Sequence, residues 1–139
     1  MDNGVEPIAD EELLYRRVPT GWYDPATALL KSEAFAPHKS NDVTGLSVSR
    51  AKYKSLEEAA RGRPGKSYYV AVLRAADLRR NGIRFVPRPG VPDGYDPAHA
   101  ELPDLNSGNR KSDETLERQR LLAEELCLRV EGPFAQSEE

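Results

Sequence analysis

A histidine and a glutamate two residues apart are the side chains of this sequence best suited to chemistry. His99 follows a turn that contains Gly and Pro, residues 93–97, and Glu101 lies two positions further on. Residues i and i+2 of a strand face the same side, so the imidazole and the carboxylate would share one face. Such a pair is typical either of an acid–base pair or substrate clamp, or of a solvated pair at a strand start. We take it as the first candidate binding site, because binding residues concentrate in loops of this kind.

The segment Tyr15-Arg16-Arg17 is the second candidate. Adjacent residues of a strand point to opposite faces, so one of the two arginines points inward or toward a cleft. An inward guanidinium needs an anionic partner, which is either an internal carboxylate or a bound phosphate or carboxylate. Ser47 and Ser49 share one face of another predicted strand, and they could line the same cleft as such an arginine.

Two other sequence features give only weak indications of a binding or catalytic site. Gly65-Lys66-Ser67 resembles the end of a phosphate-binding loop, but it follows a predicted helix and opens a strand, which is the reverse of the order that such a loop needs. Cys127 lies between two leucines, as a buried small hydrophobic residue would. With two His and one Cys in the chain, we expect no metal site, no disulfide and no cofactor.

The length and the charge distribution limit the class of protein. A chain of 139 residues suits one domain, and no apolar stretch is long enough for a membrane helix. Between Leu13 and Pro92 there are fifteen basic and six acidic residues, whereas the remainder is acidic. The acidic ends could lie near this basic body and neutralise it, or the body could present a basic surface to an anionic partner.

The residue pattern predicts a single α+β domain over residues 11–131, with frayed ends at 1–10 and 132–139. We expect a small mixed or antiparallel sheet with about three helices, the longest of them near the C-terminus. Strands are predicted over residues 13–18, 45–50, 67–73, 83–86, 99–102 and 128–130, and helices after the capping box at Ser55, over 75–81 and over 113–125. The predicted core consists of Val70, Val72 and Leu73, surrounded by Leu46, Val48, Ile83, Val86, Leu116 and Leu122.

Several short segments resemble a family of small uncharacterised bacterial proteins: Leu14-Tyr15-Arg16-Arg17, Ser32-Glu33-Ala34-Phe35, Leu46-Ser47-Val48, Asp77-Leu78-Arg79 and Pro97-Ala98-His99-Ala100. A more distant resemblance is to ADP-ribosyltransferase-like folds, including RES-type NAD-consuming toxins. Those proteins carry an Arg or His on the first strand, a Ser on a second core strand and a late carboxylate. This resemblance implies catalytic roles for Arg16 or Arg17, Ser47 or Ser49, and Glu101, with NAD as the substrate.

From these observations we expect a cytoplasmic accessory or interaction module that binds a macromolecular partner, most simply a protein, and no membrane. Under this interpretation Tyr15, His99 and Glu101 would contact the partner. The alternatives are an NAD-consuming enzyme of the ADP-ribosyltransferase type, or a relative of one that has lost its activity, and a nucleic-acid-binding protein that uses the basic body.

Overall fold

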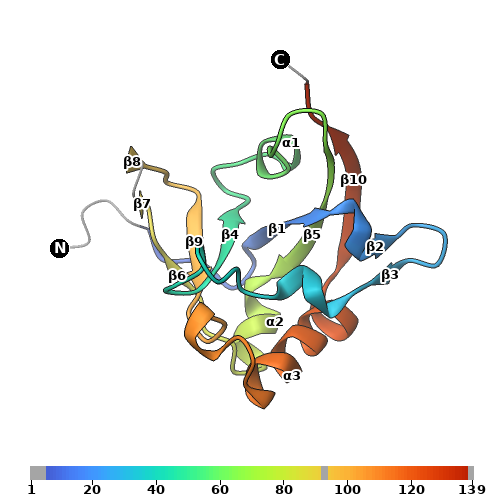
Figure 1. Ribbon diagram of the computed structural model, residues 1–139. Helices are drawn as coiled ribbons and strands as arrows, with labels where there is room; N and C mark the ends of the chain where they lie inside the picture. The colour runs from blue at the N-terminus through green and yellow to red at the C-terminus, as the bar shows by residue number, and fades with distance from the viewer. Residues whose placement is uncertain (1–5, 92–93, 138–139) are drawn as a thin grey trace.

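The computed structural model describes residues 6–91 and 94–137, and within this range the chain forms an antiparallel sheet of six strands with helices on both sides (Figure 1). In spatial order the strands are β10 (Arg129–Ala135), β5 (Ser67–Arg74), β1 (Leu13–Pro19), β4 (Leu46–Arg50), β9 (His99–Leu102) and β6 (Val86–Pro87). Two short hairpins pair β2 (Tyr23–Asp24) with β3 (Leu29–Leu30) and β7 (Gly90–Val91) with β8 (Gly94–Tyr95). The chain is therefore a single α+β domain, as its sequence predicts.

Strand β5 supplies the centre of the core. Its residues from Tyr68 to Leu73 are all buried, so both faces of this strand are covered. A near-continuous run of β-branched and aromatic residues is what an interior strand with two covered faces requires. The prediction that Val70, Val72 and Leu73 lie in such a strand is confirmed.

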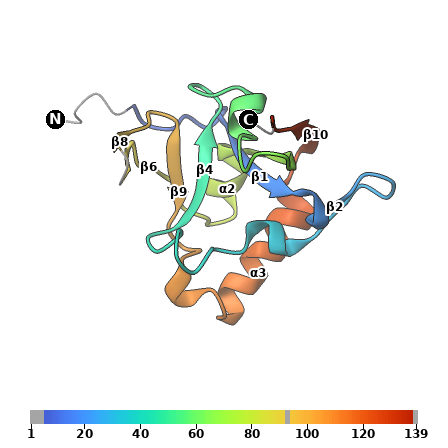
Figure 2. The same ribbon diagram turned by 45° about the horizontal axis from the view of Figure 1, so that its top comes forward.

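The helices cover the two faces of the sheet unequally. On one face lie α2 (Ala75–Arg80) and α3 (Asp113–Leu121), which is continued by a π-helical segment, Leu122–Leu126. On the other face lies the four-residue helix α1 (Leu56–Ala59), which packs near β5. Figure 2 shows α1 and α3 on opposite sides of the sheet. The larger core is thus on the face of α2 and α3, and single 3-10 turns at Thr20–Trp22, Ser32–Phe35 and Ser107–Asn109 complete the helical structure.

Helix α1 begins where the sequence predicts. Ser55 Oγ accepts from the Glu58 N–H at 3.1 Å, and the Glu58 carboxylate accepts from the Ser55 N–H at 2.9 Å. This reciprocal pair satisfies two amide groups that the first turn of a helix leaves without partners. The capping box lowers the pKa of the Glu58 carboxyl, because its hydrogen bonds to Ser55 favour the ionised form.

The predicted strand over residues 83–86 is wrong except at its end. Only Val86 and Pro87 pair with β9. The Ile83 N–H donates to Leu78 O at 2.9 Å, which closes the C-terminus of α2, and the Arg84 N–H donates to the Asp104 carboxylate at 3.2 Å. These amides are already satisfied, so the segment does not need a neighbouring strand. Ile83 is nevertheless buried, whereas Val86 is only half-buried.

The prediction that Leu116 is a core residue is also wrong, because half of its surface is exposed. The buried stripe of this helix runs through Thr115, Gln119, Leu122 and Leu126. Two of the four are polar, so the apolar residues of the sequence do not trace the buried face. Thr115 fits there because its hydroxyl accepts from Ser112 Oγ at 2.9 Å.

Ordered contacts extend beyond the predicted domain ends. Ile8, in the expected N-terminal tail, is buried in the core. In the expected acidic tail, β10 continues to Ala135, and the Gln136 side chain accepts from the Gly62 N–H at 3.1 Å and donates to Ala60 O at 3.2 Å. Among the described helices, none is both long and apolar enough to cross a membrane.

Replacing Leu73 by Ala should lower the free energy of unfolding by about 2–5 kcal/mol, because the side chain is fully buried and its loss leaves a cavity. Leu116→Ala is the matched control, and it should cost less than about 1 kcal/mol because this leucine faces solvent. Denaturant unfolding of both variants checks the assignment. Equal losses would contradict the placement of β5 in the core.

Candidate functional site

The predicted site residues other than Arg16 lie on the sheet face opposite α2 and α3. On β4 the alternate residues Leu46 and Val48 enter the core, so Ser47 and Ser49 face the other way and are half-buried. The pairing with β9 sets Ser47 opposite Glu101 and Ser49 opposite His99. The predictions that His99 and Glu101 share one face, and that Ser47 and Ser49 share one face, are consistent with this register, which also puts the two pairs on the same face.

Strand β1 brings its own polar residues to the same face. Tyr15 is paired with Ser49, while Leu14 and Val18 enter the core on the other side. Arg17, two residues after Tyr15, therefore lies on the face of Tyr15. Together Tyr15, Arg17, Ser47, Ser49, His99 and Glu101 form what we call the polar face. Three neighbouring strands contribute to it.

His99 is held by both ring nitrogens. Its Nδ1 lies 2.8 Å from the carbonyl oxygen of Arg88, and its Nε2 lies 3.2 Å from Ser47 Oγ. A carbonyl only accepts, so we assign the proton of the neutral ring to Nδ1, and Nε2 then accepts from the serine hydroxyl. The ring is therefore oriented with a lone pair directed at Ser47.

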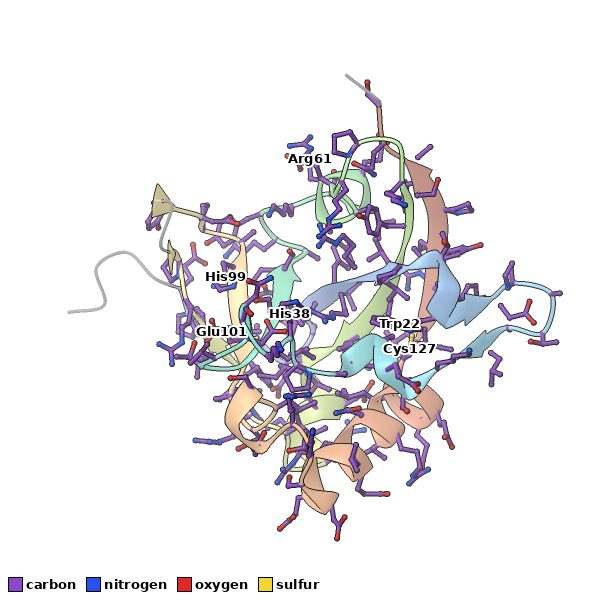
Figure 3. All side chains as sticks on the ribbon, viewed as in Figure 1. Trp22, His38, Arg61, His99, Glu101 and Cys127 are labelled. Carbon is purple, nitrogen blue, oxygen red and sulfur yellow. The ribbon has the colours of Figure 1, made fainter. Side chains whose placement is uncertain are left out.

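The Glu101 carboxylate is largely buried and has two partners of its own. Its Oε1 accepts from Thr44 Oγ1 at 2.7 Å and forms an ion pair with Arg88, whose Nε lies 2.9 Å away. Its Oε2 lies 4.0 Å from His99 Nε2, so the two predicted partners are neighbours without a direct hydrogen bond. The arginine compensates the cost of burying this carboxylate, and it ties the 88–89 segment to β9. Figure 3 shows His99 and Glu101 together on β9.

Arg16 lies on the other face and is not part of the cluster. Its Nε donates to Ala34 O at 3.0 Å, and its Nη1 donates to Ser47 O at 2.9 Å. Burial lowers the pKa of the guanidinium, and the nearby Asp42 carboxylate acts against this shift. The inward arginine that the sequence predicts thus has two backbone carbonyls as its hydrogen-bond partners.

Asp42 completes this arrangement and was not among the predicted residues. Its carboxylate accepts from the Ser47 N–H at 3.2 Å and from the His38 N–H at 2.6 Å, and the residue is buried. The N–H and the carbonyl of Ser47, which both point toward β1, are therefore hydrogen-bonded to charged side chains, the N–H to Asp42 and the carbonyl to Arg16. Asp42 follows Asn41 in a polar loop, where a carboxylate that binds nearby amides is common, but nothing in the sequence links it to Arg16.

The sequence also did not predict Thr44 and Arg88 as site residues. Each is distant from Glu101 in the chain or on another segment, and the fold brings it into contact with that carboxylate. Cys127 lies apart from the cluster in Figure 3. Burial raises the pKa of its thiol, and the thiol donates to Arg129 O at 3.3 Å. A thiol in such surroundings is a poor nucleophile, which is consistent with the interpretation of Cys127 as a packing residue.

Two surface hollows lie beside other residues. One is bounded by Arg50, Tyr53, Tyr95 and three prolines, and the other by Ile83, Phe85, Val86 and their neighbours. Neither includes a residue of the polar face. No family model, curated protein or solved structure matches the chain, so the interpretation of the site depends on its own residues.

Replacing Arg16 by Met should lower the free energy of unfolding by about 2–4 kcal/mol, because Ala34 O and Ser47 O would lose a charged donor while they remain covered. The control is Arg74→Met at the exposed end of β5, with an expected loss below about 1 kcal/mol. Urea unfolding of the two variants measures the difference. A stable Arg16→Met variant would show that this side chain does not hold the strands.

Proposed function

We propose that this chain is an interaction module that binds a protein partner on the polar face. The observation that carries the proposal is the unequal cover of the sheet. Helices α2 and α3 cover one face, while on the other the short α1 packs near β5, and Ser47, Ser49 and His99 remain half-buried over β4 and β9. Polar side chains that are partly open and held in fixed orientations suit contact with another protein surface.

The shape of the region favours a macromolecule over a small ligand. The polar face consists mostly of partly exposed side chains over β1, β4 and β9, whereas small-molecule sites are usually concave and enclose most of the ligand. The charge favours an acidic partner, because Arg17 is exposed on this face and makes no ion pair with a described carboxylate. An acidic surface on a protein partner would complement it.

Affinity purification from the native host tests the proposal. The wild-type bait should retain one partner. Binding should be lost with Ser49→Glu, which places a carboxylate in the middle of the polar face, and reduced with His99→Ala. Thr27→Glu adds the same charge in the exposed β2–β3 turn and should retain the partner. Both glutamate variants should keep the wild-type melting temperature within a few degrees. A partner that binds all variants equally would contradict the proposal.

A second candidate function is supported by the order of residues across the sheet. Arg17, Ser47 and Glu101 lie on one face of three neighbouring strands, β1, β4 and β9. This is the order of element types that the resemblance to ADP-ribosyltransferase-like proteins implies, although Arg16 lies on the opposite face. In that case NAD is the substrate, and Glu101 is the catalytic carboxylate that the resemblance implies.

Release of nicotinamide from NAD, followed by chromatography, tests this second candidate. If it is right, Glu101→Gln should reduce the rate at least a hundredfold, and Glu57→Gln on the exposed side of α1 should leave it unchanged. Absence of nicotinamide release from the wild-type protein would exclude this function and leave the interaction module unaffected.

A further inference from the structure

The loop from Arg61 to Lys66, between α1 and β5, has a fixed conformation. Tyr68 Oη accepts from the Arg63 N–H at 3.0 Å, and the Gln136 side chain accepts from the Gly62 N–H at 3.1 Å. Gly62 lies so close to Tyr68 that a Cβ on it would be 2.4 Å from the ring. The loop therefore rests on a tyrosine that is itself buried, and a larger residue at position 62 would force the loop or the ring to move.

Arg17 holds the same loop from the side of β1. Its Nη1 donates to Arg61 O at 2.5 Å, and its guanidinium carbon lies 4.9 Å from the centre of the Tyr68 ring. The stacked ring and the hydrogen bond orient this exposed side chain, while its other N–H groups remain available to a ligand. Figure 3 shows Arg61 at the α1 end of the molecule, apart from His99 and Glu101.

Four cations of this segment have no ion-pair partner among the described residues: Arg17, Arg61, Arg63 and Lys66. The three from the loop are exposed. Glu58, the nearest acid before the loop, already accepts from Ser55 in the capping box. Elsewhere on the described chain, cations such as Arg84 and Arg88 are paired with carboxylates. Among the residues that the structure describes, the loop thus concentrates positive charge that no ion pair neutralises.

We propose that Arg17 and the loop of residues 61–66 form a binding site for a phosphate or diphosphate group. A phosphate offers more charge and more acceptor oxygens than a single carboxylate, and a guanidinium fork matches it with two parallel hydrogen bonds. The cations come from six consecutive residues and one neighbour, which suits one or two phosphates. A nucleic-acid backbone needs a longer track, and toward β9 the cations Lys54 and Arg88 are already paired with Asp96 and Glu101. The site shares Arg17 with the polar face, whereas its loop cations Arg61, Arg63 and Lys66 lie outside that face, so the two proposals can be tested separately.

Titration with inorganic pyrophosphate, followed by two-dimensional 1H–15N NMR, tests the site. We expect saturable shifts at the amides of residues 61–67 and, at low salt, a measurable Kd. Arg63→Gln with Lys66→Gln should weaken binding at least tenfold. Arg74→Gln with Lys111→Gln removes the same charge at two exposed cations elsewhere and should change the Kd less than twofold. Unsaturable shifts, or equal losses in the two double variants, would overturn the proposal.

A third variant separates a built site from diffuse charge. Gly62→Ala changes no charge but must displace the loop from Tyr68. It should weaken pyrophosphate binding at least fivefold in protein that thermal unfolding shows to be folded, and an unchanged Kd would refute the proposed geometry. ADP and phosphoserine, titrated in parallel, distinguish a nucleotide from a phosphorylated protein as the source of the group. An oligonucleotide that binds this loop a hundredfold more tightly than pyrophosphate would replace the proposal with a nucleic-acid site.

Discussion

Between β1 and β4 the backbone ladder is replaced by two charged side chains. The strands pair at Leu14 and Tyr15, and beyond that point Arg16 donates to the Ser47 carbonyl while Asp42 accepts from the Ser47 amide. A buried strand must satisfy its peptide groups, and here a cation and an anion do so in place of a neighbouring strand. The two strands diverge beyond this point (Figure 1), and the Ser47 N–H and carbonyl are hydrogen-bonded by these side chains.

The hydrogen bonds from Arg16 and Asp42 to the Ser47 backbone determine where the rest of the site lies. With both peptide groups of Ser47 held on the side of β1, its hydroxyl faces His99, and β9 pairs along the other edge of β4. A second buried arginine, Arg50, closes the same strand. Its guanidinium forms an ion pair with Glu12 at 2.7 Å and donates to the Glu6 and Pro7 carbonyls, which fixes the N-terminal segment against the sheet. Both arginines are costly to bury alone, and each is stabilised by several acceptors.

Local signals in the sequence were enough for most of the elements. The capping box at Ser55, the period-two pattern of residues 46–50 and the apolar run of β5 each depend on neighbours in the chain. The same alternation correctly placed the two serines on one face. It could not place Thr44 and Arg88 beside Glu101, because these contacts join residues far apart in the sequence. The buried face of α3 was not predicted correctly, because the residues buried there, Thr115 and Gln119, are polar.

The central claim is that the half of the sheet face over β4 and β9 is a contact surface. A photo-reactive amino acid placed at Ser49, and in a separate variant at Glu117 on the exposed side of α3, tests it directly in the native host. The account predicts one crosslinked protein partner from position 49 and none of that mass from position 117. The same crosslinked protein from both positions, or from position 117 alone, would contradict it.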